Sequence, residues 1–149
     1  PAIIENSTIF GKVNVRELTG SEVLFTGALT VKRRQLGYVR FCYIPENSET
    51  SVRYRCQPDD AIETGLKKGE DEKDIRLRLC PRFTSVKYRD PGYAQLSGTC
   101  AVEIRTGAKD GSEIGVFQHL HQARREENLK NVMEEYLRSD LEGGFFYVT

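Results

Sequence analysis

Three carboxylates in the second half of this 149-residue chain have a spacing that could support acid–base chemistry. Glu103, Asp110 and Glu113 are close enough in the sequence for two of them to act as general acid and general base, the pair that glycoside hydrolysis requires. Nothing in the sequence fixes the distance between them. Polysaccharide cleavage is therefore the enzymatic alternative for this chain, and we assign no catalytic residue.

The histidines and cysteines do not form a metal-binding pattern. His119 and His121 are the two histidines, and they could share a metal on a strand but not on a helix, where residues two apart point to different sides. The four cysteines are widely spaced and include no Cys-x-x-Cys pair. We therefore expect no metal site and no cofactor.

Three arginines are the candidate binding residues. Arg40, Arg53 and Arg55 fall on two neighbouring predicted strands, where like charges repel unless something acidic covers them. The covering group is either an acidic segment of the protein, such as residues 70–72, or a phosphate or anionic glycan. Lys plus Arg and Asp plus Glu both number 22, so no overall charge attracts the chain to nucleic acid. We expect an anionic partner at these arginines and no nucleic-acid binding.

A short internal repeat indicates the architecture that positions these residues. The segment 11–16 (GKVNVR) returns sixteen residues later as 27–32 (GALTVK), and each copy follows a second apolar run. Strand–turn units at a short fixed period are typical of β-solenoids, because each coil covers the next. Residues 1–34 are therefore predicted to be solenoid-like coils, and residues 35–149 a β-rich capping domain.

A twisted antiparallel region is predicted over about residues 37–104. Segments 38–44 and 51–56 alternate on either side of polar turn residues, which predicts a hairpin with Cys42 and Cys56 on opposite faces and unable to bond. The charged segment 61–74 is predicted to be a mobile loop. Strands are expected at 75–79 and 83–88, followed by a turn at residues 90–92.

The C-terminal pattern predicts one long amphipathic helix, over about residues 124–142. Its apolar stripe ends before Gly143 and Gly144, and a final strand is expected at 145–148. Such a helix should lie on a sheet or cover the open end of the stack. The predicted fold is therefore mainly β, with a solenoid-like N-terminal edge, antiparallel strands and this C-terminal helix.

Several motifs together resemble a known group of proteins. They are segments 37–43 (GYVRFCY), 53–58 (RYRCQP), 81–85 (PRFTS), 90–93 (DPGY), 110–113 (DGSE) and the closing 135–149. This string resembles the C-terminal region of large bacterial β-helix proteins of unknown function, some associated with phage-tail-like contractile injection systems. The resemblance implies a structural or assembly role and supplies no functional residues.

We therefore expect a non-catalytic structural module that caps a β-solenoid in a larger bacterial protein or phage-tail-like particle. The alternatives are an anion- or glycan-binding module and a polysaccharide-cleaving enzyme. The expected partners are other protein chains, the rest of a larger polypeptide or a second copy of this chain. No apolar run approaches the length of a membrane span and no leader is evident, so we expect the bacterial cytoplasm or an assembled particle, without membrane insertion.

Overall fold

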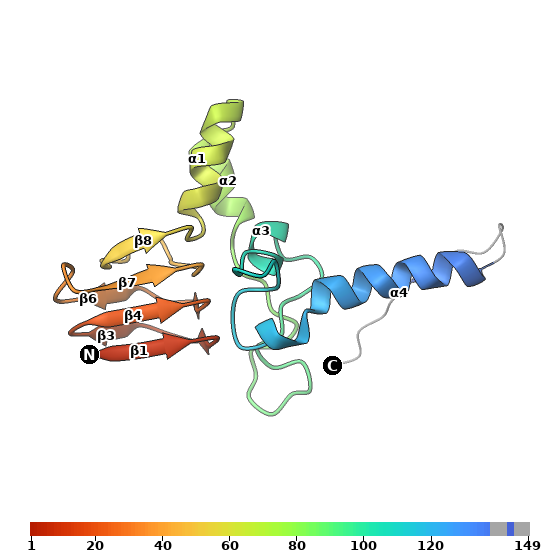
Figure 1. Cartoon of the computed structure of the whole chain (residues 1–149), viewed down its shortest axis with the longest axis horizontal. Coiled ribbons are helices and arrows are strands. Elements are labelled where there is room, and N and C mark those ends of the chain that lie inside the picture. The colour runs from red at the N-terminus through yellow and green to blue at the C-terminus, as the bar shows by residue number, and fades with distance from the viewer. Residues whose placement is uncertain (138–142, 145–149) are drawn as a thin grey trace.

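The N-terminal part of the computed structural model, which describes residues 1–137 and 143–144, is a β-solenoid. Short parallel strands stack in successive coils, and three sheets form its sides (Figure 1). The first sheet contains β1 (Ala2–Glu5), β4 (Leu18–Ser21), β7 (Gly37–Arg40) and β8 (Val52–Tyr54). The second contains β2 (Thr8–Ile9) and β5 (Leu24–Phe25), and the third contains β3 (Val13–Val15) and β6 (Leu29–Val31).

The sequence repeat sets the spacing of the first two coils. Ala2 pairs with Leu18, sixteen residues further on, and the third sheet keeps the same step. A Cβ on Gly27 would lie 2.4 Å from the carbonyl oxygen of Gly11 in the coil beside it, so only glycine fits there. The predicted solenoid-like edge is thus confirmed. The coils also continue beyond residue 34, because β7 and β8 extend the first sheet.

Each coil leaves the first sheet through a corner residue in the left-handed conformation. Asn6, Glu22, Phe41 and Arg55 occupy this corner, with φ angles of 45°, 58°, 51° and 47°. The corner shifts the alternation of side chains by one residue. The residue that follows it therefore points into the solenoid instead of away from it, and the second to fourth coils bury Val23, Cys42 and Cys56 in this way.

The predicted antiparallel hairpin is wrong, because β7 and β8 run parallel, with Tyr38 opposite Val52. The residues between them do not form a tight turn. They cross the third side of the solenoid, where Glu49 bridges to Thr30. The corner shift also corrects the prediction for the cysteines. Cys42 and Cys56 both lie in the core, so the prediction of opposite faces is wrong, but they are free thiols, as predicted. Cys42 donates to the Arg40 carbonyl oxygen and Cys56 to that of Val39.

The segment predicted to be a loop followed by a strand forms a pair of helices. These are α1 (Asp59–Lys68) and α2 (Glu72–Arg78). Gly69, with φ 82°, ends α1, and the Asp71 side chain accepts a hydrogen bond from the Lys73 N–H at the start of α2. Ile75 and Leu79 are buried while Leu77 is 72% exposed. The alternation expected of a strand therefore comes from two residues four apart on one helix face.

The second half of the chain packs against the side of the solenoid. Outward-facing side chains of the second side, among them Leu24 and Tyr43, are buried in a second core with residues from α1, α2 and the segment 96–114. Other contacts reach the first coil, where the Thr8 hydroxyl accepts a hydrogen bond from the Val116 N–H. The strand predicted at 83–88 is reduced to single bridges from Phe83 and Ser85, and the turn at 90–92 is present.

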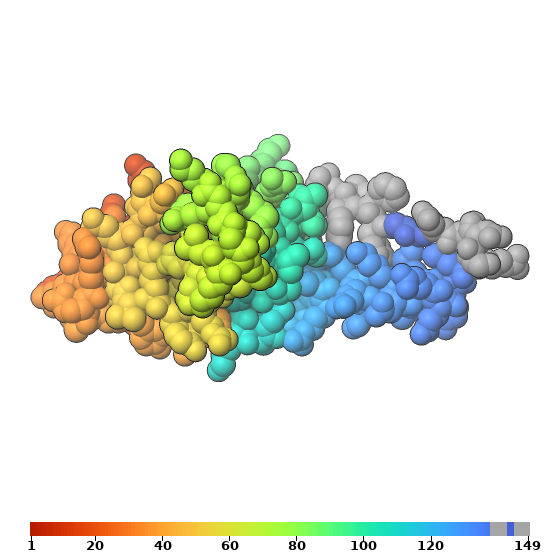
Figure 2. Space-filling view, turned by 90° about the horizontal axis from the view of Figure 1, so that it is seen from above, coloured from red at the N-terminus to blue at the C-terminus, as the bar shows by residue number. Residues whose placement is uncertain are grey.

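Two further helices and a short turn complete the described chain. They are α3 (Val102–Arg105), the 3₁₀ turn η1 (Gln118–Leu120) and α4 (Gln122–Tyr136). A C-terminal helix is present, as predicted, but the structure describes it over Gln122–Tyr136 and none of these residues is buried, so it does not show the expected apolar face. It projects away from the solenoid instead of covering it, and Tyr136 is 84% exposed (Figure 1). The molecule is elongated, with the solenoid toward one end and α4 toward the other (Figure 2), and the α1–α2 pair projects beyond β8, across this long axis (Figure 1). Residues 138–142 and the strand predicted at 145–148 lie outside the described residues.

Candidate functional site

The first coil leaves one end of the solenoid open. In the described structure β1, β2 and β3 each pair on one side only, with β4, β5 and β6. The inward side chains of this coil pack against the core from one direction and remain partly exposed; they are Ala2, Ile4, Ile9, Val13 and Val15. We call this set the open end. It combines an apolar surface with the unpaired backbone groups of three strand edges.

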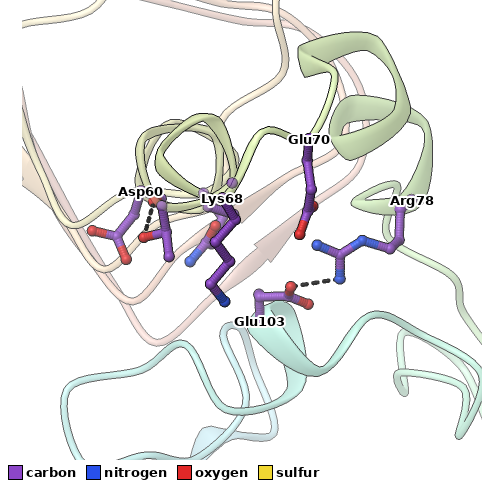
Figure 3. A pocket seen from close by; sticks show the side chains of 9 residues that line it. Asp60, Lys68, Glu70, Arg78 and Glu103 are labelled. Atoms are coloured by element: carbon purple, nitrogen blue, oxygen red, sulfur yellow. Dashed lines mark hydrogen bonds and ion pairs between the residues drawn. The ribbon is translucent and has the colours of Figure 1, made fainter.

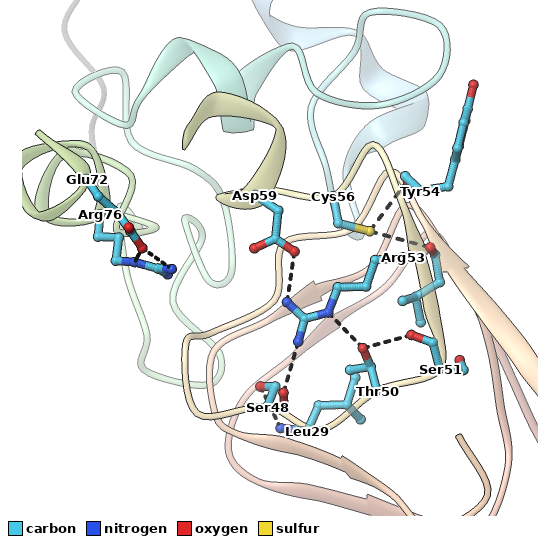
Figure 4. Close-up of polar contacts among 11 residues, drawn as sticks. Leu29, Ser48, Thr50, Ser51, Arg53, Tyr54, Cys56, Asp59, Glu72 and Arg76 are labelled. Carbon is cyan, nitrogen blue, oxygen red and sulfur yellow. Dashed lines mark hydrogen bonds and ion pairs between the residues drawn. The ribbon is translucent and has the colours of Figure 1, made fainter. Parts of the chain in front are cut away.

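The opposite end of the solenoid is closed by an arginine. Arg53 in β8 is in register with Val39, and Val39 with Gly20, a ladder whose side chains face the interior. Its guanidinium donates to the Thr50 hydroxyl (2.8 Å) and to the Ser48 carbonyl oxygen (2.9 Å), as Figure 4 shows. A third bond, also of 2.8 Å, joins it to the carboxylate of Asp59 at the start of α1.

A charge at an inward position has a specific consequence for stacking. A further coil placed on β8 would have to bury the Arg53 guanidinium beneath apolar side chains, which costs far more than it returns. The two ends of the solenoid therefore differ in kind. One end presents apolar side chains and unpaired strand edges, and the other presents an inward-facing charge.

The three arginines predicted to bind an anion do not converge on one site. Arg53 is held by the contacts just described. Arg40 donates to the Ser21 hydroxyl (3.1 Å) and lies over the ring of Tyr38. Arg55 lies over the ring of Tyr54, a β8 side chain that is itself exposed. The acidic group that pairs with Arg53 is Asp59, not the 70–72 segment.

The three carboxylates of the enzymatic alternative have different partners. Glu103 pairs with Arg78, at 2.5 Å. Asp110 accepts hydrogen bonds from the N–H and hydroxyl of Ser112; burial alone would raise its pKa, but these bonds and the nearby His121 lower it. Glu113 interacts with neither of them in the contacts that set its pKa, which involve Arg105 and Glu126.

Glu113 is the most strongly perturbed acid in the described chain. Burial raises its pKa from 4.5 to about 7, against the opposing effect of the Arg105 guanidinium, which is itself paired with Glu126 of α4. Glu113 and Arg105 thus lie beside Glu126, where the segment that precedes α4 meets that helix.

The two histidines lie at the start of the C-terminal helix, His119 within η1 and His121 directly after it. His121 adopts a left-handed conformation (φ 49°) between η1 and α4, and its Nδ1 lies 3.7 Å from the Asp110 carboxylate. Among residues 1–137 and 143–144, no three His, Cys, Asp or Glu side chains come together as a metal site. In the same residues, no helix is long and apolar enough to cross a bilayer.

The role of Arg53 could not be recognised from the sequence under the predicted pairing. An antiparallel register places Arg53 on an outer face, where a charge needs no explanation. In the parallel register, the alignment of Val39 with Arg53 puts a charge into a ladder of apolar and small side chains. A charged residue aligned with apolar and small residues in this way is the sequence signal for the end of the stack.

Comparison with known proteins yields no match, whether to a family model, to a curated protein or to a solved structure. The chain is therefore described by its fold alone. It is a short parallel β-solenoid with one open and one closed end, a laterally packed second half and a C-terminal helix.

Proposed function

We propose that this chain is a non-catalytic structural module that terminates a β-solenoid in a larger protein assembly. The observation that carries the proposal is the difference between the two ends: apolar side chains and free strand edges at one, and the inward Arg53 at the other. A module that ends a stack needs this polarity, because growth must be possible on one side and blocked on the other.

The occupant of the open end is a further parallel coil. Such a coil would pair with the free edges of β1, β2 and β3 and complete the burial of the five partly exposed side chains of the open end. Completing that burial stabilises by roughly 1 kcal/mol for each side chain. The resemblance of the sequence motifs to bacterial β-helix proteins favours a coil of the same large polypeptide or of a phage-tail-like particle.

The alternatives receive less support from the described residues. An anion-binding face would need Arg40, Arg53 and Arg55 to converge, and they lie on different partners. A glycosidase would need two carboxylates in one cleft, and those expected from the sequence each interact with different partners.

The proposal can be tested by adding a coil. A second copy of residues 2–17 is inserted ahead of Ala2 in place of Pro1, which preserves the sixteen-residue step between the first two coils. If the open end accepts a coil, the thermal unfolding midpoint should rise by several degrees and the added residues should become protected from proteolysis.

The matched control carries lysine at the Ile4 and Val13 positions of the added copy, so that its inward face cannot stack. This control should keep the original unfolding midpoint and a cleavable extension. Equal midpoints for the two extended chains would show that the open end does not accept a parallel coil.

A further inference from the structure

A loop beside the solenoid carries a row of aromatic rings that begins at the first coil. Phe10 directly follows β2, and its ring centroid lies 5.0 Å from that of Phe83 and 5.5 Å from that of Tyr93. The Tyr93 ring in turn meets the Tyr88 ring edge to face, with 5.5 Å between the centroids. We call residues 83–93 the aromatic loop. Ring contacts of this kind attach the loop to the outside of the first coil.

Hydrogen bonds fix the shape of the aromatic loop. The Ser85 N–H donates to the Gly92 carbonyl oxygen at 3.2 Å, and the Ala94 N–H donates to the Ser85 carbonyl oxygen at 3.0 Å. The Ser85 hydroxyl also donates to the Asp90 carboxylate, at 2.6 Å. A surface that is held in this way loses little conformational entropy when a partner binds.

The tip of the aromatic loop exposes apolar side chains. Tyr88 is 74% exposed and Val86 is 67% exposed, and Phe10 on the first coil is 38% exposed. Exposed apolar side chains that gather in one place indicate an interaction surface, whereas single ones do not. Tyrosine is also one of the residue types enriched in protein interfaces. The loop therefore has the composition of a docking surface.

The position of the aromatic loop indicates what covers it. In Figure 1 the green loop below α3 and α4 extends past β1, on the side where the open end lies. A further coil at the open end would pair with the free edges of β1, β2 and β3. The second side of that coil would then lie beside the loop, as the first coil already does through Phe10. The loop thus flanks the place of the added coil.

We propose that the aromatic loop is a second docking surface for the coil that occupies the open end, an inference that rests on the function proposed above. The partner is a parallel coil with an apolar side chain in register with Phe10. Because Ile9 packs against the core, this register position faces outward, toward the loop. The apolar side chain packs on the exposed parts of Tyr88 and Val86. The loop fills the space beside this coil, so the partner coil carries no insertion there.

The test compares the parent chain with the chain extended by a second copy of residues 2–17. The added copy places a second phenylalanine in register with Phe10. Tyr88→Ala should lower the thermal unfolding midpoint of the extended chain by about 3 °C more than that of the parent chain, because its ring is covered only in the extended chain. Tyr136→Ala, at an exposed tyrosine on α4, is the matched control and should change both midpoints equally.

A double-mutant cycle assigns the effect to the predicted contact. When Phe10→Ser is made in the added copy alone, Tyr88→Ala should lower the midpoints of the extended and parent chains equally. If the extension raises the midpoint but Tyr88→Ala has equal effects on both chains, or acts independently of the copied phenylalanine, this inference is wrong and the proposed function stands. If the extension does not raise the midpoint, both are wrong.

Discussion

Replacing Arg53 with methionine should open the closed end of the solenoid. Methionine keeps most of the packing of the side-chain stem but removes the contacts with Ser48, Thr50 and Asp59. The two hydrogen bonds contribute about 1 kcal/mol each, since the side chain is 27% exposed, and the ion pair less than about 1 kcal/mol. We expect a loss of about 2 kcal/mol in the free energy of unfolding, which lowers the unfolding midpoint by about 5 °C.

The same substitution should also change the state of association. With an apolar ladder at both ends, the β8 edge of one chain can pair with the β1 edge of another. This head-to-tail contact does not close on itself, so it produces linear oligomers.

The assay is light scattering with size-exclusion chromatography over a range of concentrations. Arg40→Met, an outward-facing arginine on the neighbouring strand, is the control and should show the association behaviour of the parent chain. If Arg53→Met does not increase association, or if both variants increase it equally, the inward charge does not block stacking and the reasoning fails.

Three further predictions follow from individual side chains. Because the folded-state pKa of Glu113 is raised to about 7, stability should be highest below pH 4.5 with respect to this group and fall by about 3 kcal/mol as the pH rises to 8, a loss that Glu113→Gln should abolish in denaturation curves measured at each pH. Cys80 is the exposed thiol among the four cysteines, so a thiol reagent should modify one group per native chain quickly, and Cys80→Ser should remove that fast phase; two fast phases would contradict the burial of the others. Glu22→Ala should lose about 2 kcal/mol of stability in urea unfolding, because the buried Glu22 carboxylate accepts from the Lys109 N–H, whereas Glu17→Ala on the surface should lose less than about 1 kcal/mol.

The coil spacing could be predicted from the sequence because the close approach of Gly27 to Gly11 leaves a mark in the chain itself. The parallel direction of β7 and β8 could not be predicted from the sequence. Alternating apolar residues on either side of a polar segment fit a hairpin and a pair of stacked coils equally well. The choice between them depends on contacts such as Thr30 with Glu49, which are remote in the sequence.

The buried cysteine pair was missed for a local reason. The prediction assumes that side chains alternate without interruption through Phe41 and Arg55. Each of these residues has a positive φ, which interrupts the alternation. Neither residue type favours that conformation, so nothing in the sequence marks the corner. Two hollows beside α1 and α3 were also hidden from the sequence, since their shared lining residues Gln57, Asp60 and Glu103 come together only once these helices pack against the solenoid (Figure 3).

The register of the coils determines where this solenoid can change in length. In each of the first three coils, twelve residues separate the start of the strand in the first sheet from the paired position on the third side. These pairs of positions are Ala2 and Asn14, Leu18 and Thr30, and Gly37 and Glu49. The steps between coils nevertheless differ, since Leu18 pairs with Gly37 but Tyr38 with Val52. All of the variation therefore lies at the corner that returns the chain from the third side to the first. Loops grafted at that corner, for example within residues 32–36, would leave every ladder in register, whereas a single residue inserted elsewhere would shift the coils above it.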